Sequence, residues 1–231
     1  MNDTQQIKIG LTSINTCSYL PDKDERVAVI MEDSLQSPDG YDLLMANGFR
    51  RSGNMIYRPS CPSCNACQAI RVAINDFSLS KSQKRIKNKA AQLTWQFKSV
   101  LDEEWFTLYS HYIETQHQNG SMYPPNKDEF LKFIQCDWLT TRFLHVYDEQ
   151  KLIAIAVTDI CKTSESAFYT FYDPTYPLSL GKACILYQIE FCKNQGKPWL
   201  YLGYQIDDCP AMNYKVQFQR HQRLANQCWQ G

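Results

Sequence analysis

Three cysteines follow one another at regular spacing in the stretch YRPSCPSCNAC, residues 57–67. Cys61, Cys64 and Cys67 have the C-x2-C spacing of metal ligands, and Cys17 could complete a set of four thiolates. The spacing is compatible with a bound metal or iron–sulfur cluster, with thiols that pack a tight turn, or with a redox-sensitive group. In each case the turn would hold the neighbouring arginines in place.

Those arginines lie in the stretch GFRRSGNMIYR, just before the cysteines. Arg50, Arg51 and Arg58 could recognise an acidic group, because a guanidinium can form two parallel hydrogen bonds with one carboxylate. Lys215 is a further cation that could serve such a site. For each of them, a surface ion pair or a phosphate contact is the alternative interpretation.

A basic segment, SKSQKRIKNKA, follows in the same part of the chain. Residues 48–89 contain nine basic residues and one acidic residue, whereas the rest of the chain has 15 basic and 23 acidic residues. A neutral chain with one basic block indicates a local anionic partner. A solvated helix or loop is the alternative for its five cations, Lys81, Lys84, Arg85, Lys87 and Lys89.

The composition predicts a folded protein of one large or two small domains, with 231 residues of which 44% are hydrophobic. No apolar run is long enough to span a membrane, and the N-terminal residues lack the pattern of a signal peptide. We therefore expect a cytoplasmic protein that does not contact membranes. In a reducing compartment disulfides are disfavoured, so six further cysteines are expected as small buried or half-buried side chains: Cys136, Cys161, Cys184, Cys192, Cys209 and Cys228.

The elements that must position these groups change in type along the chain. Residues 1–75 predict short strands and turns, with one short helix ending at Gly48. Helices are expected after the N-cap candidates Asp102 and Asn126. A three-stranded antiparallel meander, a helix over LGKACILYQIEFCKNQG and a buried strand WLYLGY follow.

This order of elements predicts an α/β (α+β) fold with an acetyltransferase-like, GNAT-type domain at residues 76–231 and a smaller cysteine-containing domain at residues 1–75. Acetyltransferases hold the pyrophosphate of coenzyme A on a Q/R-x-x-G-x-G/A loop. Here Leu178 takes the Gln/Arg position, which disfavours a coenzyme A-dependent enzyme. That enzyme and a non-catalytic, cysteine-knuckle RNA-binding module remain the alternatives.

Several motifs occur together and in order: CSYLP, GFRRSGNMIYRPSCPSCNAC, SQKR, FYDP, LSLGKACILYQIEF and YLGYQI followed by MNYKVQF. Over essentially the whole chain they resemble the bacterial aspartate/glutamate leucyltransferases, which are relatives of the arginyl-tRNA–protein transferases. The resemblance implies an enzyme that transfers leucine from leucyl-tRNA to proteins with N-terminal Asp or Glu. Such transfer marks the acceptor for degradation by the N-degron (N-end rule) pathway.

Two departures from the family pattern matter. Gln205 stands where Trp is usual in the segment YLGYQI. The eukaryotic relatives have two cysteine pairs linked to an iron–sulfur cluster, and here Leu20 and Ser60 replace one cysteine of each pair. We therefore expect that no cofactor is required.

The reaction implied by the resemblance is aminolysis of an aminoacyl ester, which needs proximity, a proton acceptor and donors for the oxyanion. For the reacting centre we favour Tyr204 as hydroxyl donor or relay, with the backbone at Gly203 and with Gln205. Tyr204 as a core residue is the alternative. Asp173 is expected either to anchor the amine or to stabilise a turn. The tRNA phosphates would lie on the basic segment, and the aromatic residues of AFYTFY would hold the leucine.

Overall fold

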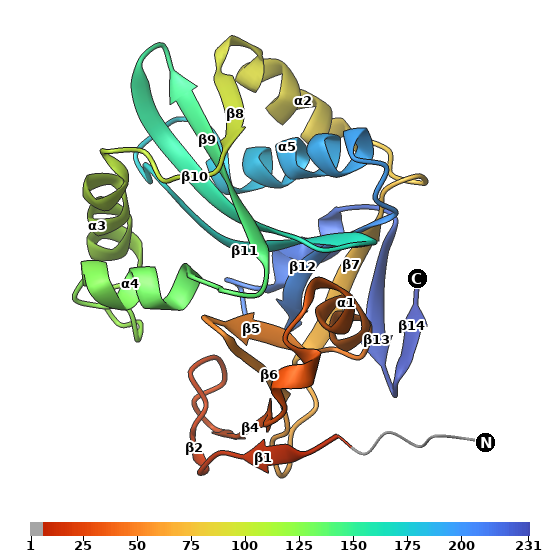
Figure 1. The fold of residues 1–231 in the computed structure, drawn as a ribbon. Coiled ribbons are helices and arrows are strands. Elements are labelled where there is room, and N and C mark those ends of the chain that lie inside the picture. The colour runs from red at the N-terminus through yellow and green to blue at the C-terminus, as the bar shows by residue number, and fades with distance from the viewer. Residues whose placement is uncertain (1–6) are drawn as a thin grey trace.

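The computed structural model describes residues 7–231, which form a small sheet, a large mixed sheet and a two-stranded ribbon, with helices around them (Figure 1). The small sheet is antiparallel with strand order β1-β4-β6-β5. Its strands are β1 (Ile9–Leu11), β4 (Val27–Ile30), β5 (Arg50–Ser52) and β6 (Met55–Pro59), and the ribbon pairs β2 (Asn15–Thr16) with β3 (Asp24–Glu25).

Helix α1 (Pro38–Ala46) and the short 3-10 helix η1 (Asp33–Leu35) adjoin the small sheet. The Ser37 side chain caps α1 by accepting a hydrogen bond from the Gly40 amide, at 3.1 Å. The helix is followed by Gly48, whose φ of +84° is the left-handed conformation that ends helices. The predicted short helix ending at Gly48 is therefore confirmed.

The large sheet has eight strands in the order β14-β13-β7-β12-β11-β10-β9-β8. The predicted meander is confirmed, because β9, β10 and β11 pair antiparallel with their neighbours in sequence. The strands are β7 (Gln68–Ala73), β8 (Thr94–Lys98), β9 (Thr140–Asp148), β10 (Lys151–Ile160), β11 (Ser164–Tyr172), β12 (Trp199–Gln205), β13 (His221–Ala225) and β14 (Cys228–Gln230).

Helices cover both faces of this sheet, because alternate residues of a strand point to opposite sides. Ile155 and Val157 of β10 pack toward α3 (Trp105–Gln116) and α4 (Lys127–Ile134). Ala154 and Ala156 pack toward α5 (Leu180–Asn194) on the other face. Beside α5 lie α2 (Lys81–Lys89) and the 3-10 helix η2 (Ala90–Gln92) (Figure 1).

The order of helices and strands from α3 to β12 confirms the predicted acetyltransferase-like fold. One prediction about a helix start was wrong. Helix α3 begins at Trp105, and Asp102 instead accepts a hydrogen bond from the Glu104 amide in the turn before it. The N-cap of α4 is confirmed, since Asn126 accepts hydrogen bonds from the amides of Asp128 and Glu129.

Strand β7 joins the two parts of the chain. It lies within the predicted N-terminal domain, yet it occupies an interior position of the large sheet, between β12 and β13. The division at residues 75 and 76 stays a prediction, but any such boundary leaves one strand of the large sheet on the N-terminal side.

Strands β11 and β12 diverge after a short parallel contact. They pair only where Ser164–Ser166 lie opposite Trp199–Tyr201. The register between β12 and β7 then shifts between Tyr201 and Tyr204, and Gly203 in this gap has a φ of +83°. The C-terminal end of β12 is therefore not paired with β11, and side chains from other elements can reach it there.

No helix within residues 7–231 has both the length and the apolar character needed to cross a membrane.

Candidate active site

Two cations meet at the open end of β12. Arg50, the first residue of β5, donates a hydrogen bond from Nη2 to the Gly203 carbonyl at 3.1 Å. Lys215 lies in the 3-10 helix η3 (Asn213–Gln217) and donates from Nζ to the Tyr204 carbonyl. Only 6% of Arg50 and 8% of Lys215 is exposed to solvent.

Neither cation has a carboxylate within ion-pair distance among residues 7–231. The Arg50 guanidinium instead lies against the rings of Tyr201 and Tyr204, with centroids 5.1 and 5.4 Å away. Burial, and after it the charge of Arg50, lowers the pKa of Lys215 to about 8. Because a buried charge is costly without a partner, this arrangement favours binding of an anion.

Gly203 allows this arrangement. Side chains rarely adopt its positive φ, and a Cβ atom here would lie 3.7 Å from Lys215 Nζ. The Gly203 and Tyr204 carbonyls each accept one hydrogen bond from a cation. The backbone near Gly203, predicted to be part of the reacting centre, thus holds the two cations.

Tyr204 and Gln205 differ in how far their polar groups are engaged. The Tyr204 hydroxyl donates to the Gly48 carbonyl at 2.8 Å, and burial raises its pKa, so the hydroxyl links β12 to the turn between α1 and β5. Its role as a relay stays a prediction. Gln205 Nε2 donates to Asp207 at 3.1 Å, but the buried Oε1 has no hydrogen-bond partner in the described part of the chain. Gln205 therefore keeps a free acceptor at this strand end.

The other two arginines of the predicted acid site are placed differently. Arg51 forms a bidentate pair with Asp159 of β10, and both side chains are fully buried. Its charge is therefore already neutralised. Arg58 is half-buried over the Phe49 ring, 4.9 Å from the centroid, and makes a long 3.5 Å hydrogen bond to a carbonyl. Of the three arginines, Arg50 is the one that lies with Lys215.

Asp173 lies in the turn after β11, and its carboxylate is engaged on both oxygens. Oδ1 accepts from the amide and hydroxyl of Thr175 at 3.0 and 2.6 Å, and Oδ2 accepts from Lys151 at 2.9 Å. Burial raises its pKa, but these hydrogen bonds outweigh that effect and lower it to about 2. This geometry matches the turn residue rather than the amine anchor.

A cluster of tyrosines faces α3 at the diverging end of β11, and sequence reasoning identified only part of it. Tyr172 belongs to the AFYTFY segment, and its ring lies 4.9 Å from that of Tyr112 on α3. Burial, and after it the phenols of Tyr172 and Tyr214, raises the pKa of Tyr112. Tyr214 directly precedes Lys215, and this adjacency is the feature of the sequence that could have identified it. Together these rings are candidates for an apolar aminoacyl site.

The four cysteines named from their spacing come together beside this site. Burial, and after it the thiols of Cys61, Cys17 and Cys64, raises the pKa of Cys67 to about 12. Cys67 directly precedes Gln68, which pairs with Gln205 of β12, so the loop borders this strand end. Within residues 7–231, however, no three His, Cys, Asp or Glu side chains are arranged to hold a metal ion.

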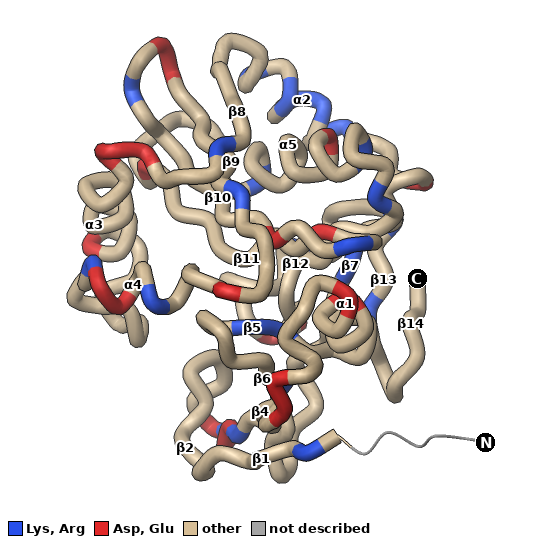
Figure 2. The backbone as a smooth tube through the Cα atoms, in the orientation of Figure 1, with Lys and Arg blue, Asp and Glu red and all other residues tan. Residues whose placement is uncertain are grey.

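The basic segment forms helix α2, whose first turn has a complete capping box between Ser80 and Gln83. Its five cations are all exposed, and Figure 2 shows them along α2 with no acidic residue between them. Among the ion pairs within residues 7–231, Lys87 is the one α2 cation with a partner, Glu190 of α5 at 3.2 Å. Gln83 is buried and donates to the Gln217 carbonyl at 3.1 Å, which links α2 to the element that carries Lys215.

Comparison with known proteins identifies the family. Residues 15–85 match the family described as arginine-tRNA-protein transferase, N terminus, and residues 104–225 match the corresponding C terminus. An aspartate/glutamate leucyltransferase of Vibrio campbellii is 60% identical over 230 residues, with 99% of each chain covered. The chain belongs to the aspartate/glutamate leucyltransferase family. Members from Vibrio cholerae and Aeromonas hydrophila are 57% and 43% identical, over 99–100% of this chain and 97–99% of theirs.

Membership of this leucyltransferase family makes the chain an aminoacyltransferase. Solved structures are less similar. L-PGS from Bacillus licheniformis aligns with a TM-score of 0.47 and 12% identity, over 61% of this chain and 47% of that chain. FemX aligns with a TM-score of 0.47 and 6% identity, over 87% and 80%. Likenesses this weak add nothing to the fold assignment, which rests on the strand order.

Proposed function

We propose that this aminoacyltransferase moves leucine from leucyl-tRNA to the α-amino group of proteins beginning with Asp or Glu. The names of its relatives support this function. The observation that carries it is the pair of buried cations, Arg50 and Lys215, that have no acidic partner in the described residues. Transfer would take place in the cytoplasm and would feed the N-degron pathway.

The acceptor's acidic side chain supplies the charge that the site lacks. A carboxylate beside Arg50 and Lys215 would accept charge-assisted hydrogen bonds and offset the repulsion between the two cations. An Asn or Gln side chain has a similar shape but no charge, so it would leave that repulsion in place. Under this proposal, selection between acidic and neutral N-termini would result from the buried pair.

The leucyl ester is already activated, so the reaction needs no further source of free energy. The acceptor nitrogen attacks the carbonyl carbon of the leucyl ester and forms the amide bond. The ester C–O bond breaks, and the tRNA hydroxyl leaves with a proton that the amine gives up. Gln205 Oε1 is a buried acceptor without a partner in the described residues, and it would orient the attacking amine. We assign no step to a metal or other cofactor.

The donor substrate would occupy two further parts of the molecule. The exposed cations of α2 would contact the tRNA phosphates: Lys81, Lys84, Arg85, Lys87 and Lys89. The tyrosine cluster formed by Tyr112, Tyr172 and Tyr214 would enclose the leucyl side chain. Since η3 carries both Tyr214 and Lys215, it would lie between the donor and the acceptor.

The direct test is transfer of labelled leucine from leucyl-tRNA to peptides that differ only in their first residue. We expect transfer to peptides beginning with Asp or Glu and little transfer to those beginning with Asn or Ala. Labelled acetyl-coenzyme A in place of leucyl-tRNA is the control for the acetyltransferase alternative. Absence of leucine transfer, or equal transfer to the Asp and Asn peptides, would refute the proposed function.

A further inference from the structure

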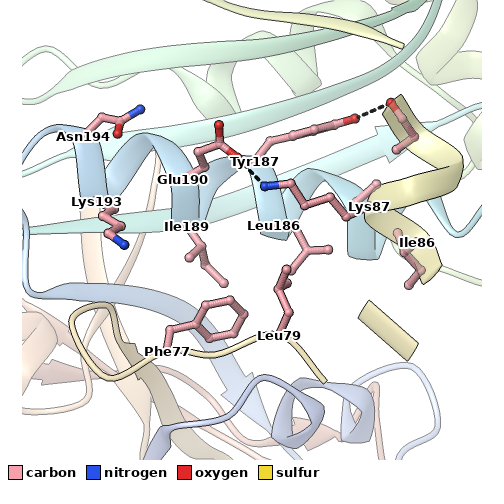
Figure 3. Close-up of a pocket in the computed structure, with 12 residues that line it drawn as sticks. Phe77, Leu79, Ile86, Lys87, Leu186, Tyr187, Ile189, Glu190, Lys193 and Asn194 are labelled. Carbon is pink, nitrogen blue, oxygen red and sulfur yellow. Dashed lines mark hydrogen bonds and ion pairs between the residues drawn. The ribbon is translucent and has the colours of Figure 1, made fainter. Parts of the chain in front are cut away.

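A groove lies between α2 and α5, apart from the two cations at β12. Its floor is apolar and consists mainly of the half-buried Phe77, Leu79 and Ile86 with Leu186 and Ile189 of α5. Figure 3 shows these side chains converging on one space between the helices. The space is about 400 Å³, within the range of about 300–1,000 Å³ typical of small-ligand sites.

Lysine side chains border this groove on both sides. Lys87 of α2 lies on one side and Lys193 of α5 on the other (Figure 3). The other exposed cations of α2 lie on the same helix as Lys87 (Figure 2). The pair between Lys87 and Glu190 is the one ion pair that these groups form within residues 7–231. A cationic rim over an apolar floor is complementary to a ligand that combines an anion with a flat or apolar body.

Two polar side chains narrow the choice of ligand. Glu190 and Asn194 are one helical turn apart on α5, and both line the groove. A carboxylate accepts hydrogen bonds from an exocyclic base amine, and an amide can pair with a base edge. An acidic side chain only accepts hydrogen bonds and could not pair with the Glu190 carboxylate. These groups therefore favour a nucleotide base over an acidic protein segment.

We propose that this groove binds an unpaired nucleotide of the tRNA, with its base on Phe77 and the adjoining phosphates on the cations of α2. The proposal rests on the proposed function, because it assumes a tRNA substrate. Its position suits that role, since the hydrogen bond from Gln83 to Gln217 joins α2 to the element that carries Lys215. The groove would thus hold the RNA while its aminoacyl end reaches the open end of β12.

The first test measures the Kd for leucyl-tRNA over a series of salt concentrations. We expect Phe77→Ala to raise the Kd roughly 5- to 150-fold, as for loss of one stacked base, without changing the salt slope. Lys84→Ala should instead lower the slope by about one unit. The matched control is Phe191→Ala on α5, a half-buried ring that stacks on Phe97 with centroids 3.8 Å apart, outside the groove.

A second variant keeps the proposal testable if Phe77→Ala fails to fold. Phe77→Trp keeps an aromatic face, so we expect normal affinity and quenched emission of the new indole when tRNA binds, with no such quenching for Phe191→Trp. Unchanged Kd for Phe77→Ala, or no quenching at position 77, overturns the groove proposal even where leucine transfer is intact. Quenching by an acidic peptide and not by tRNA overturns it too. Failure of the parent enzyme to bind leucyl-tRNA would instead refute the proposed function.

Discussion

At the scale of single residues, Arg50 and Arg51 show that two neighbouring arginines in one strand can have different roles. Neighbours in a strand point to opposite faces, so Arg50 points to the end of β12 and Arg51 points to Asp159 of β10. The sequence predicts that a cation in this segment recognises an acid. It could not predict which arginine, because Asp159 lies 108 residues further along the chain.

We expect Arg50→Ala to lower kcat/KM for a peptide beginning with Asp by roughly 10- to 150-fold, mainly through KM. The reason is loss of a charge-assisted hydrogen bond, on the order of 1.5–3 kcal/mol. Arg58→Ala is the matched control and should keep the preference for Asp over Asn. The measurement is steady-state transfer to both peptides. Undiminished preference in the Arg50 variant would place acid recognition elsewhere.

Arg51→Ala should act on stability rather than on recognition. It leaves the Asp159 carboxylate buried without its partner, which typically costs about 3–5 kcal/mol. Urea unfolding followed by circular dichroism measures this loss. Replacing both partners with apolar residues, as in Arg51→Met with Asp159→Leu, should recover much of it. If the Arg51→Ala variant is as stable as the parent, the result would contradict the role of this ion pair in stability.

The lowered pKa of Lys215 predicts a pH dependence of acid binding. Its pKa in the folded enzyme is about 8, below the usual 10.5, so the charge is present below pH 8 and is lost as the pH rises. A succinyl peptide, which is an Asp peptide without its amine, should inhibit roughly tenfold less strongly at pH 9 than below pH 8. Cys67, with a pKa of about 12, does not titrate in this range.

The control for this experiment is the neutral succinamoyl peptide, the corresponding analogue of Asn. It has no carboxylate, so its weaker inhibition should not depend on pH between 7 and 9. Removing the amine from both inhibitors keeps the titration of the acceptor nitrogen out of the measurement. Inhibition by the succinyl peptide that stays constant up to pH 9 would argue against Lys215.

At the scale of elements, local signals identified most helices and strands. Ser37, Ser80 and Asn126 cap helices through hydrogen bonds to nearby amides, which are contacts within a few residues. Strand β8 was missed because its five residues gain their partners from β9, more than 40 residues later. Asp102 was misplaced as an N-cap because a turn precedes α3. Local patterns thus identify elements, whereas pairing between distant elements fixes their order and boundaries.

The cysteine loop is an element whose chemistry can be tested directly. We expect enzyme purified without oxygen to transfer leucine at an unchanged rate after metal chelation. The reason is that Leu20 and Ser60 replace two of the cysteines linked to the cluster in relatives. Metal analysis and leucine transfer, each before and after the chelator, are the measurements. Stoichiometric iron or zinc whose removal abolishes transfer would contradict this expectation.

At the scale of the whole molecule, the two parts of the chain share a strand. Because β7 pairs with β12 on one side and β13 on the other, a fragment of residues 76–231 lacks an interior strand of its sheet. We expect this fragment to show no cooperative thermal transition, whereas the complete chain should unfold cooperatively. Circular dichroism over a temperature range compares them. A cooperative transition in the fragment would mean that its sheet closes without β7.

The shared strand also affects how the protein is made. The ribosome releases β7 early, but its neighbours β12 and β13 begin at residues 199 and 221. At about 5–20 residues per second, β7 waits on the order of 6–25 s for its first partner. During that time both edges of the strand are unpaired and its apolar residues Ile70 and Val72 are exposed to solvent, which promotes aggregation. We therefore expect the nascent chain to depend on chaperones, and chains from stalled ribosomes to be degraded.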